Sequence, residues 1–394
     1  MNTPLQLAAA HLAMHNTQTL AWQCAVTRIA APTGAESERG HWMAAQFSAI
    51  GWSDVVIDTV GNVIARRPAV GRSAAQAQMR AVWCCAHLDT VFAIETPDVQ
   101  QVGARLTGPG IGDNGRGLAA LLAIGHAMAQ ATLVTPHEVV LACTVGEEGL
   151  GDLRGMKQLM RDASPSPLAV IALDGPGDDR IVNVALGSTR LRIVFRGPGG
   201  HSWVDYGVVN PVHAAASAAA LLQVVALPRD PRTTLTVTRM SGGESINSVP
   251  REAWLDVDMR SISATVLADL ERTLRQVVTR VERTENGRRL PDSPVLTSEI
   301  VPLGSRPCGV IAPEAPLLRI AQQATRDSGG TPRFATASTD ASIPIAMGIA
   351  AIAIGAGGRG GGTHTPEEWY DDTGGVAGLQ RALRIVAGAA GCRS

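Results

Sequence analysis

The chain has 394 residues, of which 45% are hydrophobic and 18% are charged, and its formal net charge is −1 at pH 7. This composition is typical of a globular protein with two or three domains and enough apolar material for a sizeable core. The balanced charge and the lack of a basic run argue against nucleic acid and anionic membranes as partners.

The N-terminal segment, residues 1–22, predicts an opening helix of a cytoplasmic protein. It has no Lys or Arg before its apolar part, and His11 and His15 interrupt that part, so it fits neither a signal peptide nor a membrane span. The six cysteines include no C-x-x-C pair. Three of them lie inside apolar runs, which predicts buried core residues in a reducing compartment: Cys84, Cys85 and Cys143.

Short apolar strands alternate with helices in both outer parts of the chain. The strands are apolar almost throughout, which is typical of strands covered on both faces. We expect them at Ala81–Ala86, Glu138–Thr144, Leu168–Leu173 and Ile349–Ile354, with helices at Leu118–Gln130 and Pro316–Asp327. This alternation predicts an α/β sheet flanked by helices.

A different pattern occupies the middle of the chain. Arg190–Arg196 alternates polar and apolar residues, which predicts a strand with one solvent-exposed face. The elements predicted after it are a helix at Pro211–Val225, strands at Thr233–Met240 and Ala253–Arg260, a helix at Ala264–Glu285 and a strand at Leu296–Val301. This β-α-β-β-α-β order is ferredoxin-like. We therefore predict a discontinuous catalytic domain at 1–186 plus 306–394 that carries an inserted lid domain at 187–305.

Residues able to bind a metal or to move a proton gather at the ends of the predicted strands and in the loops after them. They are His87 and Asp89 in HLDT, Asp113 in GPGIGDNGRG, Glu147 and Glu148 in GEEGLG, Asp174 in LDG and His364 in THTPEEW. Taken alone, each has an ordinary alternative: a histidine in a surface loop, a helix N-cap at Asp113 or Asn114, or a solvated acidic turn. Together they favour a metal site, because ligand sites of open α/β sheets form at this edge.

The donor types indicate which metals would bind. Two nitrogens and three carboxylates suit zinc, with cobalt or manganese as alternatives. Three ligands suffice for one catalytic metal, and five therefore predict two metals about 3.5–4 Å apart with one shared carboxylate. Glu147 and Glu148 are adjacent, which is costly unless a cation neutralises one of them, and the other can then accept a proton from water.

The glycine-rich run Gly355–Gly360 matches the pattern G-x-G-x-x-G of dinucleotide-binding proteins. A dinucleotide site also needs a helix that opens at the last glycine, and this run leads instead into Thr363–Pro366. We therefore expect these glycines to let the backbone of a substrate come close rather than to bind a nucleotide.

The five motifs, in this order and spacing, resemble those of the two-zinc exopeptidase and deacylase family of peptidase T, glutamate carboxypeptidase, aminoacylase, acetylornithine deacetylase and succinyl-diaminopimelate desuccinylase. The resemblance covers nearly the whole chain. It implies a zinc-exopeptidase-like catalytic domain, a mixed sheet flanked by helices, with a ferredoxin-like lid domain that forms homodimers. It further implies two zinc ions per subunit, bound by His87, Asp113, Glu148, Asp174 and His364, with Asp113 as the bridge. Asp89 matches the partner of His87, and Glu147 matches the general base.

The lid motifs resemble family segments with three further roles. In GPGGHSW, His201 matches the histidine that helps to stabilise the oxyanion and that, in dimeric members, reaches the active site of the other subunit. In SGGESINSVPREAWLDVDMRS, Asn247 and Arg260 match residues that hold the substrate, and a guanidinium suits bidentate binding of its carboxylate. The chain departs from the family at Asp113-Asn114-Gly115, where two acidic residues or Asp-Asp-Lys are common, but the bridging position itself is kept.

These roles predict a metal-dependent hydrolase that cleaves a peptide or amide bond of a small substrate with a free carboxylate, as a peptidase T-like or carboxypeptidase-like exopeptidase. Asp174 in Leu-Asp-Gly fits peptidase T and carboxypeptidase members, whereas some deacylases have Glu there. An N-acyl amino acid deacylase is the alternative, and a non-catalytic peptide-binding relative is a more distant one. The expected partners are therefore a small peptide or N-acyl amino acid and a second copy of the chain.

Overall fold

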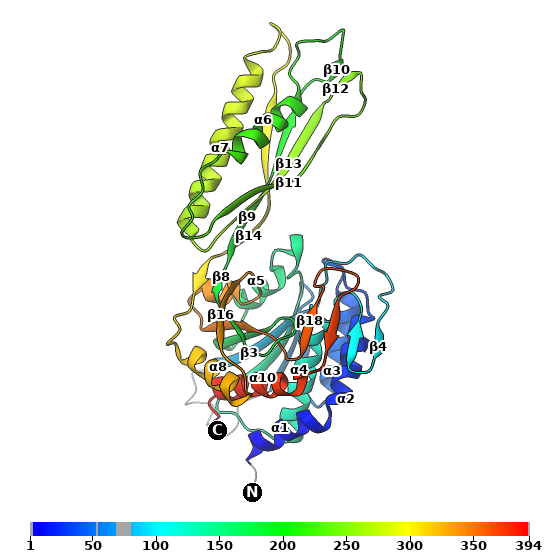
Figure 1. Cartoon of the computed structure of the whole chain (residues 1–394), viewed down its shortest axis with the longest axis vertical. Helices are drawn as coiled ribbons and strands as arrows, with labels where there is room; N and C mark the ends of the chain where they lie inside the picture. Colours follow the sequence, from blue (N-terminus) through cyan, green and yellow to red (C-terminus); the bar gives the residue numbers. More distant parts are fainter. Residues whose placement is uncertain (1–2, 53, 68–79, 393–394) are drawn as a thin grey trace. The chain divides into compact units, whose positions relative to one another are not determined.

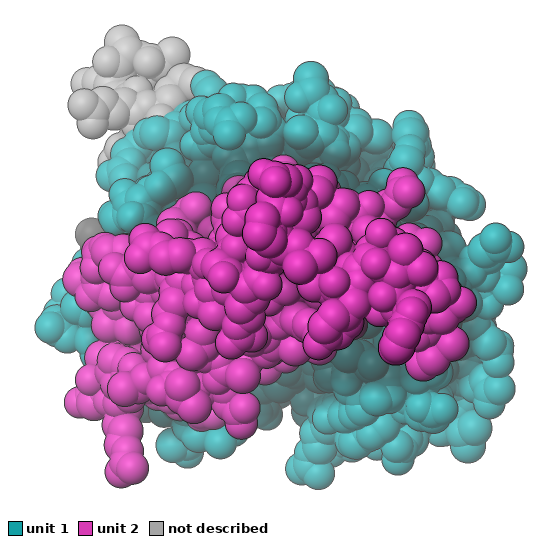
Figure 2. Space-filling view, turned by 90° about the horizontal axis from the view of Figure 1, so that it is seen from above, with its two compact units in different colours: residues 1–185, 309–394 teal, residues 186–308 magenta. Residues whose placement is uncertain are grey.

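The computed structural model describes residues 3–52, 54–67 and 80–392. The chain divides into two compact units: residues 1–185 with 309–394 form unit 1, and residues 186–308 form unit 2 (Figure 2). The borders differ from the predicted 187–305 by one residue at the start and by three at the end. The later end has a physical reason, because the last strand of unit 2 stays paired as far as Arg306.

Unit 1 is built on a mixed sheet of nine strands, in the order β1-β2-β6-β3-β7-β17-β8-β15, with β16 paired to β8 (Figure 1). The strands are β1 (Asp54–Ile57), β2 (Val63–Arg67), β3 (Arg80–His87), β6 (Glu138–Thr144), β7 (Ser166–Leu173), β8 (Arg180–Ala185), β15 (Gly309–Val310), β16 (Arg333–Ala337) and β17 (Ala351–Ile354). The neighbours β6, β3, β7 and β17 run parallel. Their carboxyl ends therefore lie at one edge of the sheet.

Helices cover both faces of this sheet, which explains the continuous apolar runs of its central strands. The helices are α1 (Pro4–Met14), α2 (Asn16–Thr27), α3 (Ser37–Ala49), α4 (Gly115–Gln130), α5 (Arg154–Arg161), α8 (Pro316–Asp327), α9 (Ser342–Ala346) and α10 (Gly375–Ala389). Side chains of β3 point alternately to the two faces. Val82 and Cys84 pack in the core with residues of α4 and α10, whereas Trp83 and Cys85 pack with residues of α5 and α9.

Two details of the predicted elements need correction. The opening segment forms α1 and α2 rather than one helix, because the backbone of His15 leaves the helical conformation (φ −108°, ψ 21°). A second, four-stranded sheet was not predicted; it has the order β18-β19-β5-β4 and consists of β4 (Gln100–Val102), β5 (Arg105–Thr107), β18 (Arg359–Gly361) and β19 (Trp369–Asp371).

The predicted burial of three cysteines is confirmed, because Cys84, Cys85 and Cys143 are fully buried in β3 and β6; all six cysteines are free thiols. Among the described residues, no helix has both the length and the apolar composition that crossing a bilayer requires.

Unit 2 has the predicted β-α-β-β-α-β order. Its elements are β9 (Gly187–Arg196), α6 (Pro211–Gln223), β11 (Thr234–Gly242), β13 (Glu252–Ser261), α7 (Ala264–Asn286) and β14 (Thr297–Arg306). The strands form an antiparallel sheet in the order β11-β13-β9-β14, and α6 and α7 pack with it in a separate core. A short ribbon, β10 (Gly200–His201) paired with β12 (Ser248–Val249), extends beyond the sheet (Figure 1).

Candidate metal centre

Four neighbouring parallel strands bring most of the predicted ligands to one edge of the sheet in unit 1. β3 ends at His87, and Asp174 follows β7 directly. The turn after β6 carries Glu147 and Glu148, and His364 lies in the segment after β17 and β18. Residues up to 277 positions apart in the sequence, His87 and His364, therefore meet because parallel strands end side by side.

Asp113 lies between two groups of these donors. In the first group, donor atoms of His87, Asp113 and Asp174 all lie within 4.8 Å of one another, and in the second those of Asp113, Glu148 and His364 do. One carboxylate oxygen of Asp113, Oδ1, is 3.0 Å from His87 Nε2, and the other, Oδ2, is 3.4 Å from His364 Nε2. Asp113 thus offers one oxygen to each group.

These residues fit a pair of divalent transition metals. Two ligands of one tetrahedral zinc ion lie about 3.3 Å apart, since each is about 2.0–2.1 Å from the metal. The His87–Asp113 distance of 3.0 Å and the Asp113–His364 distance of 3.4 Å bracket that value, and His364 Nε2 is 2.9 Å from Glu148 Oε1. The mixed imidazole and carboxylate donors also suit zinc, cobalt and manganese.

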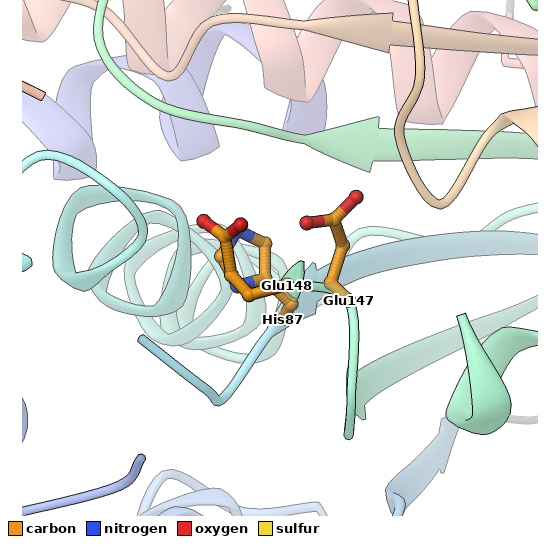
Figure 3. A group of neighbouring side chains, drawn as sticks. All are labelled: His87, Glu147 and Glu148. Carbon is orange, nitrogen blue, oxygen red and sulfur yellow. The ribbon is translucent and has the colours of Figure 1, made fainter. Parts of the chain in front are cut away.

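Glu147 and Glu148 are adjacent in sequence but differ in their surroundings. Both are buried, and each places a carboxylate oxygen within 4.8 Å of a donor atom of His87. In Figure 3 the carboxylate of Glu148 overlaps the ring of His87, whereas the side chain of Glu147 extends separately from the turn. Glu148 is also within hydrogen-bonding distance of His364. Glu148 thus belongs to two groups of close donor atoms, one of them with Asp113 and His364, whereas Glu147 belongs only to the group with His87 and Glu148.

Asp89 connects the end of β3 with the turn after β6. It is fully buried, and its Oδ1 and Oδ2 accept hydrogen bonds of 2.9 Å from the backbone N–H groups of Glu147 and Glu148 respectively. The Nδ1 atom of His87 is 3.0 Å from the carbonyl oxygen of Asp89 and 3.6 Å from its Oδ1. Asp89 therefore contacts both His87 and the backbone of the acidic turn, and the contact with the turn was not predicted.

Two further side chains that sequence reasoning missed hold the same turn. The N–H group of Val145 donates to Asn62 Oδ1 at 3.0 Å, and that of Gly146 donates to Glu36 Oε1 at 3.0 Å. Arg154 pairs with the other oxygen of Glu36 at 2.7 Å. With the bonds to Asp89, the N–H groups of residues 145–148 all donate to buried side-chain oxygens. No sequence motif pointed to Asn62 or Glu36.

The alternative role for Asp113 as a helix cap is wrong, because the next residue takes that role. Asn114 Oδ1 accepts from the N–H groups of Gly117, in α4, and Gly175, which follows Asp174, at 3.1 and 3.2 Å. Asn114 also donates to the carbonyl of Leu173 at the end of β7. Asn114 thereby ties the start of α4 to the end of β7 and leaves the carboxylate of Asp113 for the donor groups.

The closeness of these groups shifts their pKa values in a metal-free site. Burial lowers the pKa of His87, but its contacts with Asp113 and Asp89 raise it well above the ordinary value. A hydrogen bond to Asp113 raises the pKa of His364 to about 9. Burial and the charge of Asp113 raise the pKa of Asp174 to about 6. The raised pKa values of the histidines reflect imidazolium stabilised by carboxylates, and the raised pKa of Asp174 reflects a buried carboxylate beside another negative charge, as expected for a cluster of metal ligands that only protons neutralise.

The three predicted lid residues lie in unit 2 and occupy two different places. His201 and Asn247 lie together on the β10–β12 ribbon, where Ser202 N–H donates to the carbonyl of Asn247 at 3.0 Å. His201 Nδ1 accepts from the N–H groups of Trp203 and Val204 at 3.2 and 3.4 Å. Arg260 lies near the far end of β13, and its Nε donates to Asp258 at 2.8 Å.

The glycines of 355–360 have an internal explanation, so the predicted approach of a substrate backbone is not needed to account for them. A Cβ atom on Gly355 would lie 2.5 Å from the carbonyl oxygens of Pro176 and Gly177, and one on Gly357 would lie 2.6 Å from the carbonyl oxygen of Gly375. The run packs directly against neighbouring backbone, and larger residues do not fit.

Comparison with known proteins identifies similar sequences and folds. The model of peptidase family M20/M25/M40 matches residues 83–390. A protein from Aeropyrum pernix, named as a LysW-lysine/LysW-ornithine hydrolase, is 30% identical over 236 residues, which cover 59% of this chain and 60% of that protein. An IAA-amino acid hydrolase ILR1-like 2 from Arabidopsis thaliana is 26% identical over 168 residues, 38% of each chain. The matches thus span at most 60% of these curated relatives.

Solved structures match over almost their full length. A tripeptidase from Staphylococcus aureus superposes with a TM-score of 0.77 at 20% identity, over 95% of this chain and 98% of that one. A dinuclear metal-binding peptidase of family M20 from Bacillus subtilis superposes with a TM-score of 0.67 at 14% identity, over the same shares of the two chains, 95% and 98%. The fold is therefore shared by both.

Proposed function

Because the chain belongs to peptidase family M20/M25/M40, we propose that it is a metal-dependent hydrolase that cleaves a peptide or amide bond of a small substrate with a free carboxylate. The observation that carries this proposal is the pair of donor groups that share Asp113, with one further carboxylate, that of Glu147, near His87. General-base catalysis at a metal pair needs that combination: ligands for two cations and one carboxylate outside the ligand set.

The cations we propose are two zinc ions per subunit, with cobalt or manganese as substitutes. His87, Asp113 and Asp174 would hold one, and Asp113, Glu148 and His364 the other, because these two of the three groups of close donor atoms share Asp113. When bound, such a pair polarises the carbonyl of the substrate and lowers the pKa of the attacking water. The dinuclear metal-binding peptidase from Bacillus subtilis, which has this fold, supports two ions over one.

Glu147 is the proposed general base. It accepts a proton from the attacking water and later gives that proton to the leaving amine. Glu148 cannot serve this role as well, since its carboxylate lies 2.9 Å from His364 within a donor group. The hydrogen bonds that the backbone N–H groups of Glu147 and Glu148 donate to the carboxylate of Asp89 fix both residues, so that their adjacent side chains can have different roles.

We also propose roles for the residues of unit 2. His201 accepts two backbone hydrogen bonds at Nδ1, so that its hydrogen sits on Nε2. A neutral imidazole with this hydrogen can donate to the oxyanion of a tetrahedral intermediate. Arg260 would bind the substrate carboxylate through its guanidinium fork, and Asn247 would donate or accept at the substrate amide.

We propose a homodimer because His201 and Arg260 lie far apart within unit 2. Glu252, next to the ribbon that carries His201, and Arg260 are at positions 1 and 9 of β13, about 26 Å apart at 3.3 Å per residue. A tripeptide spans only about 11 Å. We therefore propose that Arg260 of one subunit and His201 of its partner hold the same substrate.

Exposed apolar side chains near this ribbon support the proposed dimer. Trp203, Tyr206 and Ile246 have exposed fractions of 85%, 81% and 104%. A group of large apolar side chains on a protein surface is typical of an interaction site. We therefore place part of the dimer contact at the ribbon of unit 2.

The leading substrate class is a small peptide, and an N-acyl amino acid is the alternative. The tripeptidase of similar fold favours the first class, and the sequence match to an IAA-amino acid hydrolase favours the second. Both reactions break an amide and use the same proposed residues. We propose a cytoplasmic location, supported by six cysteines that are all free thiols.

The test is a hydrolysis assay of metal-loaded protein on tripeptides and on N-acyl amino acids, with and without a chelator. We expect chelator-sensitive turnover of one class. Glu147→Gln should lower kcat by about 10²–10⁴-fold while both metals stay bound, and Glu95→Gln, a surface substitution of the same kind, should leave kcat unchanged. A metal-loaded protein that binds peptides but hydrolyses neither class would make the chain a non-catalytic relative.

A further inference from the structure

Glu368 places a buried carboxylate inside the loop that carries Asp113. Its exposed fraction is 1%. Its Oε2 accepts a hydrogen bond from the N–H group of Gly110 at 3.0 Å, and its Oε1 accepts from Gly112 at 2.9 Å and from Asp113 itself at 2.7 Å. The carbonyl oxygen of Glu368 accepts a fourth bond, from the N–H group of Gly108 at 2.8 Å. One residue thus receives four backbone bonds from the six-residue segment 108–113.

The glycines of this loop are shaped around that carboxylate. A Cβ atom on Gly112 would lie 2.8 Å from Glu368 Oε1, which is closer than such contacts allow, and Gly110 has a φ of +75° that disfavours other residues. The run GPGIGD therefore has a structural cause, because its backbone must curve tightly enough to point three N–H groups at two oxygens.

Glu368 is also joined to the second histidine of the site. It follows His364 by four positions, and the segment between them is closed by hydrogen bonds from Thr365 N–H to Gly362 and from Glu368 N–H to Thr365. On the other side, Trp369 begins β19 and pairs with Thr107, the last residue of β5. The two loops that carry Asp113 and His364 are therefore locked together at Glu368.

We propose that Glu368 is a positioning residue, which fixes the backbone of Asp113 so that its two carboxylate oxygens face His87 and His364. This inference rests on the proposed function, since Asp113 is taken to be the shared ligand. The physical reason is that the side chain of Asp113 is short, so the places of its two oxygens, 3.0 Å from His87 and 3.4 Å from His364, depend closely on the position of its backbone. Loss of an outer residue that orients a ligand typically weakens metal affinity or activity 10–100-fold.

A Gln at position 368 gives the sharpest perturbation, because it has nearly the same shape. Its amide keeps one acceptor oxygen, but its NH₂ group must then face either the N–H group of Gly110 or those of Gly112 and Asp113, and two donors repel. Glu368→Asp keeps both acceptors on a shorter side chain. Glu367, the exposed neighbour, provides the matched control as Glu367→Gln.

The experiment measures Co²⁺ binding to the metal-stripped full chain by calorimetry at pH 8. This pH lies above the pKa of Glu368, which burial raises to about 7. The visible spectrum of the bound Co²⁺ and the thermal midpoint of the metal-free protein are recorded alongside. We expect Glu368→Gln to weaken binding of both ions 10–100-fold and to change the spectrum, with a smaller effect for Glu368→Asp and none for Glu367→Gln.

Each outcome separates this inference from the proposed function. If the wild-type chain binds no Co²⁺, the proposed metal centre is wrong. If it binds two ions and a folded Glu368→Gln variant has the same affinity and spectrum, Glu368 serves only the stability of the loop and the inference is overturned. If Glu368→Gln does not fold, Gly112→Ala is used instead, because its new Cβ atom would push against Glu368 Oε1. Unchanged Co²⁺ binding in Gly112→Ala would then overturn the inference equally.

Discussion

Replacement of Asp89 by Asn tests whether one buried carboxylate holds the acidic turn in place. The side chain is 0% exposed and accepts from the N–H groups of Glu147 and Glu148 at 2.9 Å, one on each oxygen, and from the hydroxyl of Thr33 at 2.8 Å. The Asn side chain has the same shape but only one acceptor oxygen. Its NH₂ group must face one of the two N–H groups, which leaves that donor unpaired.

The size of the effect follows from these contacts. A buried donor left unpaired costs about 1–3 kcal/mol, and the bond that remains loses the extra strength that a charged acceptor gives, about 1 kcal/mol. We therefore expect the free energy of unfolding to fall by about 2–4 kcal/mol in the metal-free protein. Co²⁺ affinity should fall about 10–100-fold as well, because the turn that carries Glu147 and Glu148 loses one of the two acceptor oxygens that hold it.

The pKa of Asp89 gives the pH dependence of this difference. Burial raises that pKa, but the hydrogen bonds with His87 and with the N–H groups of Glu148 and Glu147 lower it from 3.8 to about 2. A depressed pKa in the folded state means that the ionised carboxylate stabilises the fold at pH values above 3.8 and that this contribution is lost as the pH falls towards 2. The difference in the free energy of unfolding between wild type and Asp89→Asn should therefore be largest at pH 7 and become smaller only in acid.

Urea unfolding at pH 7, followed by tryptophan fluorescence, measures the stability difference, and calorimetry measures Co²⁺ binding. Asp98→Asn, a substitution of the same kind at an exposed position, is the control and should stay within about 0.5 kcal/mol of wild type. An Asp89→Asn variant with wild-type stability and wild-type Co²⁺ affinity would refute the reasoning, because the turn would then not depend on its acceptors.

Two further predictions concern the ligands and the turn. His364→Ala should lose one of two bound metals, and Asp113→Ala should lose both, because Asp113 belongs to both donor groups. Metal analysis after dialysis measures the number of bound ions. Equal losses in the two variants would count against a shared ligand. Gly146→Ala should lower the free energy of unfolding by about 1–3 kcal/mol. The reason is that φ is +65° at this position and that the new Cβ would lie 2.1 Å from the guanidinium of Arg154. Urea unfolding measures the change, and an unchanged midpoint would show that Arg154 moves aside without cost.

Sequence patterns predicted the elements that depend on a repeated apolar pattern. The bounds expected for β6 and α8 agree with the structure at both ends, because a strand covered on two faces leaves a continuous apolar run and an amphipathic helix leaves a periodic apolar pattern. The three-residue strands β4 and β18 were missed because they are too short to show alternation. Their pairing depends on contacts with distant segments.

The sequence predicted residues that the structure brings together at the candidate site, but not most of the residues that hold them in place. His87 and Asp174 could be found because each ends an apolar strand, and strands of that kind finish at one edge. Glu36 and Glu368 could not be found, because a buried carboxylate held by backbone N–H groups has the same residue type as a solvated one. Glu367 and Glu368 are adjacent and identical, yet one is exposed and the other is buried.

The way in which unit 2 joins unit 1 has a consequence for how such a chain can change. Ala185 pairs with Gly309 in unit 1, and Ser188 pairs with Arg306 in unit 2. The entry and exit of the insertion are therefore neighbours, and a short hairpin turn from residue 185 to 309 would reconnect the sheet. Gene recombination at this one point could remove or exchange the whole of unit 2, and with it the proposed substrate-binding residues and dimer contact, while the order of the strands that carry the proposed metal ligands stays intact.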